Sequence, residues 1–298
     1  MIRRILGAVL LACLMPAVAL AGQPLPVAAS FSILGDMVKN VGGDRVAVTT
    51  LVGPNQDTHA YEPRPSDAKA LAGAGLVFVN GLGFEGWMPR LIEASGAKGK
   101  TIVASHGVKT ITMINEDEGG KKITDPHAWQ DLSNGKLYVA NIEKALSQAD
   151  PEGAETYRAN ARSYIEKITE LDAWVKTGFA KVPTAERKII TSHDAFGYFG
   201  AAYGVTILAP MGFSTESEAS AKNVGGLIRQ IRQEKVKALF IENMSDPRLI
   251  ERIAKETGTK VGGALYSDAL SAPDQPGATY LDMFRNNAGK MVAAMTGQ

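Results

Sequence analysis

Cysteine is almost absent from the sequence. The only one among 298 residues is Cys13, which lies inside an apolar run at the N-terminus. If that run is removed on export, the remaining chain has no disulfide. A chain of this length buries enough apolar surface to fold without such cross-links. The sequence therefore predicts a fold that is held together by core packing alone.

Clusters of basic residues and low-complexity tracts are also missing. The 32 Lys and Arg residues nearly balance the 31 Asp and Glu residues, which gives a net charge of +1. Proteins that bind nucleic acid usually carry a concentrated positive surface, so we expect no nucleic-acid partner. The composition, 45% hydrophobic and 21% charged, is that of a globular protein long enough for two domains.

A long apolar run occurs only at the start of the chain. Two arginines precede the run Ile5–Leu20, and Ala19-Leu20-Ala21 forms a small-x-small cleavage site. We predict that residues 1–21 are a cleaved signal peptide. The mature, soluble protein is then expected to begin at Gly22 and to reside in the periplasm.

Two other interpretations of this run have less support. A membrane-spanning anchor is disfavoured because the run is short and contains Pro16. The sequence Leu10-Leu-Ala-Cys13 faintly resembles a lipoprotein attachment site. The apolar run continues past Cys13, however, and the better cleavage signal comes later. We therefore expect secretion through a cleavable signal rather than anchoring through a lipid on Cys13.

The longest helical pattern lies in the middle of the chain, from Asp150 to Gly178. Asp150 is a good N-cap, Pro151 fits the first helical position, and Gly178 is a stop signal. Apolar residues recur on one helical face at Ala154, Tyr157, Ala161, Tyr164, Ile165, Ile168, Leu171 and Val175. A helix of this length spans about 40 Å. We therefore predict a strut that joins two lobes.

Strand and helix patterns alternate on both sides of this helix. Before it, strands are predicted at Pro26–Phe31, Val46–Val52, Leu76–Asn80 and Thr101–Ser105. After it, strands are predicted at Arg187–Thr191, Val205–Ala209, Ala238–Asn243 and Lys260–Tyr266. This alternation predicts an α/β fold with two parallel sheets. The expected division is an N-terminal lobe at 22–149, a linking helix at 150–180 and a C-terminal lobe at 181–298.

Two local features are predicted just before the linking helix. The segment Asn115–Lys122 carries mixed charge, which predicts a solvated surface loop. Ser133 is predicted to be the N-cap of a helix that continues to about Ala149.

Three of the four histidines follow strand or turn patterns, and none lies on a helical stripe. They are His59, His127 and His193, and Asp268 follows the strand Lys260–Tyr266 in the same way. Ligands of open α/β sheets bind outside the carboxyl ends of the strands, so two facing lobes could place these side chains around one cleft. Three imidazoles and one carboxylate form a four-coordinate set suited to zinc.

Each of these residues also has an ordinary interpretation. A loop histidine is more often a capping or hydrogen-bonding residue, and Asp268 could cap the turn in Tyr-Ser-Asp-Ala. His106, the fourth histidine, is interpreted as an ordinary surface residue. The equivalent placement of the other three at strand ends is what favours a metal site.

The segment Gly81-Leu-Gly-Phe-Glu-Gly86 fits the G-x-G-x-x-G pattern of dinucleotide-binding loops. It follows a strand and opens a helix, as such a loop should. It comes after the third strand rather than the first, however, and no acidic residue ends the next strand about 20 residues later. An exported protein would also rarely meet NAD. We therefore reject the dinucleotide interpretation.

Five motifs, spread in order over essentially the whole mature chain, carry a resemblance to a known family. They are Gly53-Pro-Asn-Gln-Asp-Thr-His-Ala-Tyr-Glu-Pro-Arg-Pro-Ser-Asp-Ala68, Asn80-Gly-Leu-Gly-Phe-Glu-Gly-Trp87, Asp125-Pro-His-Ala-Trp129, Thr191-Ser-His-Asp-Ala-Phe196 and Tyr266-Ser-Asp-Ala-Leu270. They resemble the signatures of the solute-binding proteins that feed zinc and manganese ABC importers, in particular the zinc-uptake type of cluster A-I.

The resemblance implies both an architecture and a site. It implies two Rossmann-like α/β lobes with parallel sheets, joined by one long rigid helix, with a single metal in the cleft between the lobes. It also implies that the four metal ligands are His59, His127, His193 and Asp268.

The choice of metal depends on two departures from the family's patterns. Many zinc-specific members carry a long His- and Asp-rich loop before the second ligand motif, whereas Asn115–Lys122 is short and has no histidine. Some manganese members have Glu where this chain has His193. Because the donor set stays rich in nitrogen, we predict one Zn²⁺ per chain, with Mn²⁺ as the alternative.

The predicted function is capture of this metal outside the cytoplasm and its delivery to an ABC permease in the inner membrane. The rival is a secreted zinc hydrolase, whose metal would keep an open position for water and a nearby general base. Four protein ligands leave no such position, and the sequence has no H-E-x-x-H. We therefore expect a monomeric transport protein that is not an enzyme. The sequence leaves open whether a periplasmic metallochaperone supplies the metal.

Overall fold

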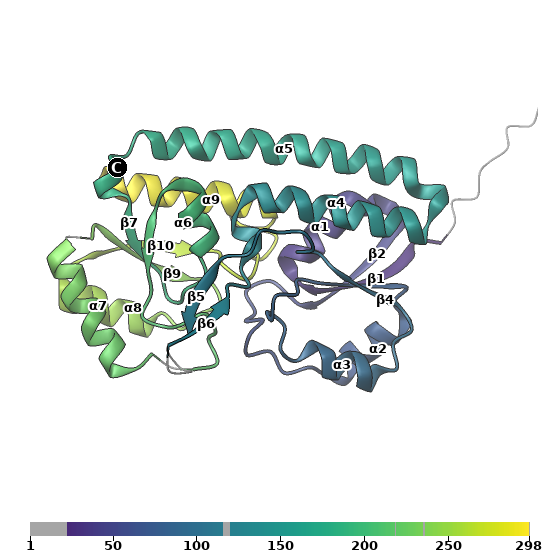
Figure 1. Ribbon diagram of the computed structural model, residues 1–298, viewed down its shortest axis with the longest axis horizontal. Coiled ribbons are helices and arrows are strands. Elements are labelled where there is room, and N and C mark those ends of the chain that lie inside the picture. Colours follow the sequence, from purple (N-terminus) through teal and green to yellow (C-terminus); the bar gives the residue numbers. More distant parts are fainter. Residues whose placement is uncertain (1–22, 116–119, 218, 235, 298) are drawn as a thin grey trace, which may run out of the picture.

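The computed structural model shows two lobes side by side beneath one long helix, α5 (Figure 1). It describes residues 23–115 and 120–297, apart from 218 and 235. The predicted signal peptide and Cys13 therefore lie outside the described residues. In the described part of the chain, no helix combines the length and the hydropathy needed to cross a membrane.

The N-terminal lobe is a four-stranded parallel sheet with helices on both faces. Its strands, in the order β2-β1-β3-β4, are β1 (Leu25–Phe31), β2 (Val46–Val52), β3 (Leu76–Val79) and β4 (Lys100–Val103). Its helices are α1 (Ser32–Gly42), α2 (Pro65–Gly73) and α3 (Met88–Ser95). All four residues of β3 are buried, because helices cover both sides of the sheet.

The C-terminal lobe repeats this plan. Its parallel strands, in the order β10-β9-β7-β8, are β7 (Lys188–Ile190), β8 (Thr206–Leu208), β9 (Ala238–Glu242) and β10 (Lys260–Leu265). Its helices are α6 (Gly197–Tyr203), α7 (Ala221–Glu234), α8 (Arg248–Thr257) and α9 (Tyr280–Thr296). Counted within each lobe, both sheets have the order second-first-third-fourth. The predicted α/β class with two parallel sheets is confirmed.

A small antiparallel hairpin interrupts the alternation. It pairs β5 (Thr112–Asn115) with β6 (Lys121–Thr124). The prediction of a loop over Asn115–Lys122 is therefore wrong at both ends, and residues 116–119 lie outside the described residues. The physical reason is the alternation of exposed and buried side chains along Thr112–Asn115, which suits a strand better than a loop.

The long helix starts slightly later than predicted. α5 runs from Ala154 to Ala180, and Asp150 caps a short 3₁₀ turn (Pro151–Gly153) ahead of it by accepting a 3.2 Å hydrogen bond from the Gly153 N–H. Asp150 also pairs with Arg45 at 2.8 Å, which fixes this end of the helix to the N-terminal lobe. The Asp150 carboxylate binds both the Gly153 N–H and Arg45, and this explains why α5 begins after the 3₁₀ turn.

The preceding helix, α4 (Leu132–Ala149), has a different cap from the predicted Ser133. The side chain of Asp131 accepts a 2.7 Å hydrogen bond from the Ser133 N–H. Both residues are good N-caps, and the stronger acceptor, two positions earlier, takes the role.

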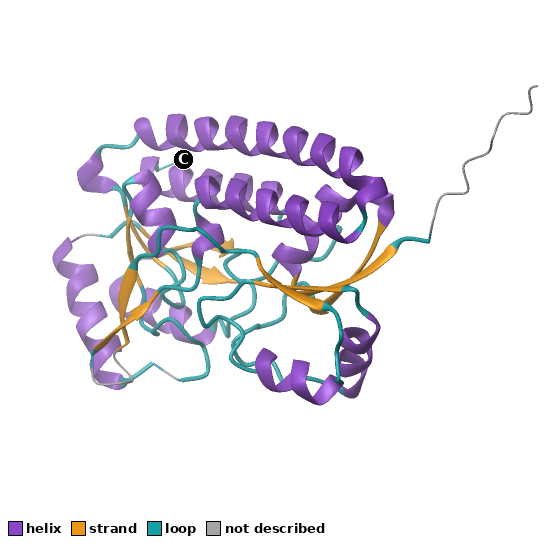
Figure 2. Ribbon diagram, turned by 45° about the vertical axis from the view of Figure 1, so that its right-hand side comes forward, coloured by secondary structure: helices purple, strands orange, loops and turns teal. Residues whose placement is uncertain are grey.

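One hydrophobic core runs through both lobes beneath α5. The helix contributes a continuous buried face: Ala154, Tyr157, Ala161, Tyr164, Ile168, Leu171, Val175 and Phe179. Helices α1 and α4 pack against one half of α5, and α6 and α9 pack against the other. A separate, smaller core lies under α7 and α8. The layer of long helices covers one side of both sheets, and loops gather between the lobes (Figure 2).

The glycine-rich segment that resembles a dinucleotide loop encloses an internal carboxylate. Glu85 accepts hydrogen bonds from Ser30 Oγ (2.6 Å), from the Asn80 N–H (2.6 Å) and from the Gly81 N–H (3.2 Å). Gly81 and Gly83 have φ values of 81° and 83°, which favour glycine. Two of the N–H groups in this turn are therefore already occupied by a side chain of the protein.

Candidate metal centre

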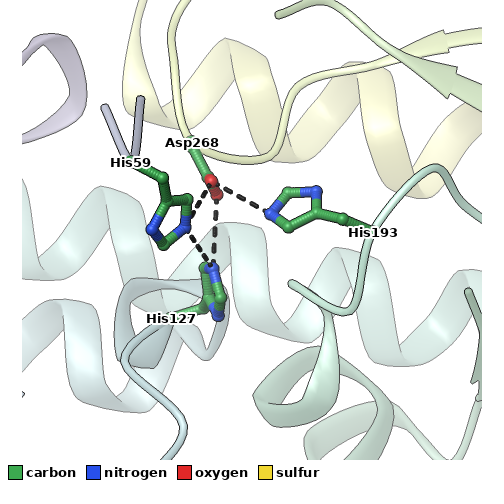
Figure 3. Close-up of side chains that lie close together, drawn as sticks. All are labelled: His59, His127, His193 and Asp268. Carbon is green, nitrogen blue, oxygen red and sulfur yellow. Dashed lines mark hydrogen bonds and ion pairs between the residues drawn. The ribbon is translucent and has the colours of Figure 1, made fainter. Parts of the chain in front are cut away.

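The structure brings together the four residues that the sequence singled out. His59 lies in the loop between β2 and α2, His127 follows β6, His193 follows β7 and Asp268 follows β10. All four are buried, and one ligand atom from each lies within 4.8 Å of the others (Figure 3). Two of these residues come from each lobe, so the cluster forms where the two sheets face each other.

Several distances between ligand atoms are close to those around a small metal ion. His59 Nε2 lies 3.4 Å from His127 Nε2 and 3.3 Å from Asp268 Oδ2, and His193 Nε2 lies 3.1 Å from Asp268 Oδ2. His127 Nε2 and Asp268 Oδ1 are 3.8 Å apart. A tetrahedral zinc site with bonds of 2.0–2.1 Å has edges of about 3.3 Å. Three of these distances are thus close to that edge, whereas the ligand atoms as a whole lie only within 4.8 Å of one another.

His59 is placed by a loop of irregular structure. Its N–H donates a 2.9 Å hydrogen bond to Asp57 Oδ1, and Trp87 Nε1 donates to the carbonyl oxygen of Thr58 at 2.8 Å. The ring of Phe84 packs edge-on against the imidazole, with 4.8 Å between the ring centres. Turn bonds and aromatic packing, rather than a regular element, therefore direct His59 inward.

His127 is oriented by a carboxylate two residues earlier. Asp125 Oδ1 accepts hydrogen bonds from both the backbone N–H and the Nδ1 of His127, each at 2.9 Å. Asn80 Nδ2 holds the intervening Pro126 carbonyl at 2.9 Å. With Nδ1 engaged by Asp125, the ring presents Nε2 to the centre.

His193 also has a carboxylate beside its outer nitrogen. Glu242 Oε2 lies 2.5 Å from His193 Nδ1, and both residues are fully buried. Sequence reasoning missed Glu242 as part of this environment. The available signal was an acidic residue at the carboxyl end of the apolar strand Ala238–Glu242, where the same strand-end argument applies.

The charges of the cluster act on one another. Burial lowers the pKa of His59, because desolvation penalises the imidazolium. Burial also opposes charge on His193, but Glu242 and Asp268 outweigh it and raise the pKa of His193. For Asp268, burial is likewise outweighed, here by His193 and His127, and the pKa is lowered. Asp268 Oδ1 is buried without a hydrogen-bond partner, as expected of an atom that can bind a cation.

The remaining histidine lies at the surface. His106 is exposed, and its backbone carbonyl accepts a 2.8 Å hydrogen bond from Asn141 Nδ2. This agrees with its interpretation as an ordinary surface residue.

A large polar cleft lies next to the cluster. It has a volume of about 860 Å³ and is lined by β5, by α7 and by Asp125 and Asp194, which are neighbours of His127 and His193 in the chain. None of the four clustered residues lines the cleft itself. The centre is therefore shut off from this opening by its own supporting residues.

Comparisons with known proteins identify the family. A family model described as "Zinc-uptake complex component A periplasmic" matches residues 27–294. The manganese ABC transporter substrate-binding lipoprotein PsaA of Streptococcus anginosus is 34% identical over 284 residues, covering 93% of this chain and 91% of the relative. The manganese-binding lipoprotein MntA of Halalkalibacterium halodurans is 32% identical, with coverages of 92% and 90%.

Solved structures of similar shape are also metal-binding proteins. The Mn-bound periplasmic metal binding protein from Candidatus Liberibacter asiaticus has a TM-score of 0.81 and 35% identity, covering 90% of this chain and 98% of that one. The periplasmic zinc binding protein TroA from Treponema pallidum has a TM-score of 0.85 and 29% identity, with coverages of 92% and 99%.

The family consists of transport components rather than enzymes, and its substrate-binding proteins work with a membrane permease and its ATPase. The match covers nearly the whole described chain, and the four residues named from the resemblance lie together in the structure. The chain belongs to the zinc-uptake component A (ZnuA) family and is the substrate-binding protein of a metal ABC transporter.

Proposed function

We propose that this protein captures Zn²⁺ outside the cytoplasm and presents it to its permease. The observation that carries this proposal is the set of ligand atoms itself, three imidazole nitrogens and one carboxylate oxygen within 4.8 Å of one another. Zinc accepts such a mixed set in a tetrahedral arrangement without preference from its d-electrons. Burial of all four residues suits a cargo that must be held away from competing ligands.

The proposed ligands are Nε2 of His59, His127 and His193 together with Asp268. Four protein ligands would close a tetrahedral zinc ion, whereas a catalytic zinc keeps one position for water. Four protein ligands therefore support a metal-carrying protein and disfavour a secreted zinc hydrolase.

Manganese is the second candidate, because particular observations favour it. Relatives that are about a third identical are named as manganese-binding proteins. In the site, the unpartnered Oδ1 of Asp268 offers a second oxygen next to Oδ2. Manganese prefers oxygen ligands and higher coordination than zinc does. The nitrogen of His193 is the feature that favours zinc over this alternative.

Location and anchoring are proposed from the sequence. Residues 1–21 would direct export to the periplasm, and 22–149, 150–180 and 181–298 would form the N-terminal lobe, linking helix and C-terminal lobe. Several relatives are named lipoproteins, which favours Cys13 as an attachment site more than its sequence context does. Intact-mass analysis of the exported protein decides between a terminus at Gly22 and a lipidated Cys13.

Metal analysis of the purified protein tests the function. Protein purified without added metal should contain one zinc per chain, and competition against a chromogenic chelator should give tighter binding for zinc than for manganese. A stoichiometry near two, or tighter binding of manganese, would contradict the proposal. Size-exclusion chromatography with light scattering would test the expected monomer.

A further inference from the structure

A buried glutamate beside the proposed site has both of its oxygens engaged. Glu242, the last residue of β9, is fully buried. Its Oε1 accepts hydrogen bonds from the backbone N–H groups of Ser192 (2.8 Å) and His193 (2.9 Å). Its Oε2 accepts a 2.5 Å hydrogen bond from Ser267 Oγ and lies 2.5 Å from His193 Nδ1. The glutamate therefore joins the ends of β7, β9 and β10.

The contact with His193 requires a proton on the ring nitrogen. Nitrogen and oxygen at 2.5 Å are closer than two lone pairs can approach, so Nδ1 carries a proton. Oε2 sits off the axis of an Nδ1–H bond, which makes the contact an ion pair rather than an aligned hydrogen bond. A ring that keeps its proton on Nδ1 can release the proton on Nε2, the nitrogen that faces Asp268, and leave a lone pair there for a metal (Figure 3).

We propose that Glu242 is a positioning residue of the metal site, which selects the tautomer of His193 in which Nε2 is free to bind metal. The inference rests on the proposed function of this site. A partner on the second ring nitrogen commonly fixes the tautomer of a metal-binding imidazole, and losing such a partner typically weakens metal affinity about 10–100-fold.

Replacing the glutamate by its amide separates this role from simple loss of charge. In Glu242→Gln, two backbone N–H donors keep the amide oxygen at the position of Oε1, so the NH₂ group takes the place of Oε2. An NH₂ group donates hydrogen bonds and does not accept them. It would therefore stabilise an unprotonated Nδ1 and shift the ring proton of His193 to Nε2. A nitrogen that carries a proton cannot bind a metal.

Asp125 provides a matched comparison on the other side of the site. It is also buried against a histidine, but a single oxygen, Oδ1, accepts from both the N–H and the Nδ1 of His127. The amide oxygen of Asp125→Asn can occupy that position and leave the His127 tautomer unchanged. Both variants remove one buried negative charge beside a proposed ligand. The loss of that charge should therefore weaken zinc binding by a similar amount in both.

The test measures zinc affinity by competition with a chromogenic chelator, using the full mature chain. We expect Glu242→Gln to weaken zinc binding by ~100-fold and Asp125→Asn by ~10-fold or less. ¹⁵N NMR of the histidine rings should show His193 unprotonated on Nδ1 in Glu242→Gln alone. Equal weakening by the two variants, or an unchanged His193 tautomer in Glu242→Gln, would overturn the inference.

A second measurement, made in the His193→Glu variant, separates the proposed role from a folding defect caused by Glu242→Gln. In His193→Glu the imidazole is gone, so adding Glu242→Gln should cost less than ~3-fold in zinc affinity if its effect acts through the tautomer. The same cost in both backgrounds would overturn the positioning role. If the wild-type protein binds zinc and the two amide variants behave alike, this inference alone fails. If the wild-type protein binds no metal, the proposed function fails as well.

Discussion

The two sides of the proposed site hold their histidines in different ways. On one side, His127 and His193 are fully buried, and a carboxylate lies against Nδ1 of each. On the other side, His59 is 6% exposed and is flanked by the rings of Phe84 and Phe213. In the described part of the chain its Nδ1 has no carboxylate partner. The first side is fixed by buried charge, and the second depends on the conformation of a loop.

The loop that carries His59 is fastened to the opposite lobe. Three hydrogen bonds make this fastening, which we call the loop clasp: Asn55 N–H to Leu270 O (2.9 Å), Asn243 Nδ2 to Asn55 Oδ1 (2.8 Å) and Thr215 Oγ1 to Asp57 Oδ2 (2.5 Å). Because the clasp crosses between lobes, a small lobe movement would loosen His59 first. We therefore expect metal to enter and leave on the His59 side.

The largest expected effect is stabilisation of the whole protein by metal, since zinc would join both sides. Free zinc at 1,000-fold above the dissociation constant should raise the free energy of unfolding by about 4 kcal/mol. Thermal unfolding with and without zinc measures this gain. The midpoint should rise in zinc and stay unchanged in magnesium, which prefers oxygen ligands.

This gain should shrink as the pH falls from about 7.5 to about 5. Glu242 and Asp268 outweigh the effect of burial and raise the pKa of His193, so its ring holds a proton that zinc must displace. The metal-free protein gains stability from that proton fully below the unfolded pKa of about 6.5 and loses it as the pH rises through the raised value. A zinc-induced shift that is constant over this range would contradict the account.

Removal of single ligands should have the next largest effect. Apparent zinc affinities of four-ligand sites correspond to about 3 kcal/mol per ligand, so His193→Ala should weaken zinc binding by roughly 100-fold or more. His59→Ala should cost less, because water can reach the exposed edge of the site and replace the ring. Calorimetric titration of both variants measures the difference. Equal losses of zinc affinity in the two variants would contradict the proposed difference between the His59 side and the His193 side of the site.

Exchange of one ligand type should shift metal preference by a smaller amount. His193→Glu replaces a nitrogen by a carboxylate, which manganese prefers, and should narrow the preference for zinc over manganese by ~1–3 kcal/mol. His106→Ala, at the surface, should leave the ratio unchanged. Competition titrations with both metals give the two ratios. If the ratio in His193→Glu equals that of the wild type, His193 is not a ligand.

Loosening the loop clasp should have the smallest effect, on rate more than on affinity. Thr215→Val removes the hydrogen bond to Asp57 while keeping the shape of the side chain, and should speed zinc release about 5-fold, equivalent to about 1 kcal/mol. Thr177→Val, which removes a hydrogen bond within α5 at an exposed position, is the matched control. Stopped-flow transfer of zinc to a chelator measures both rates. Identical rates would show that the clasp does not hold His59.

The regular elements could be predicted from sequence because their signals are local. β2 has its predicted bounds, Val46–Val52, and the other predicted strands differ by only one or two residues at either end. Errors arose where two local signals compete. Asp131 and Ser133 are both good caps only two positions apart, and Asp150 serves a 3₁₀ turn instead of starting α5 directly.

The four clustered residues could be named because they follow strands whose ends meet in this fold, and because their motifs resemble those of a known family. Their supporting contacts could not. Glu242 lies 49 residues from His193, and Thr215 lies 158 residues from Asp57. The strand-end position of Glu242 marks it as a candidate for the site, but nothing in the local sequence says which imidazole it contacts. Only the packing of β7 beside β9 reveals that pairing.

The central claim is that one metal lies between the two lobes on ligands from both. Anomalous diffraction at the zinc edge, from crystals of zinc-loaded protein, tests it most directly. The account predicts one peak per chain, bonded to Nε2 of His59, His127 and His193 and to Asp268 at about 2.0–2.1 Å, with no water on the metal. A peak elsewhere, or a zinc ion held by three of these residues and a water molecule, would contradict it.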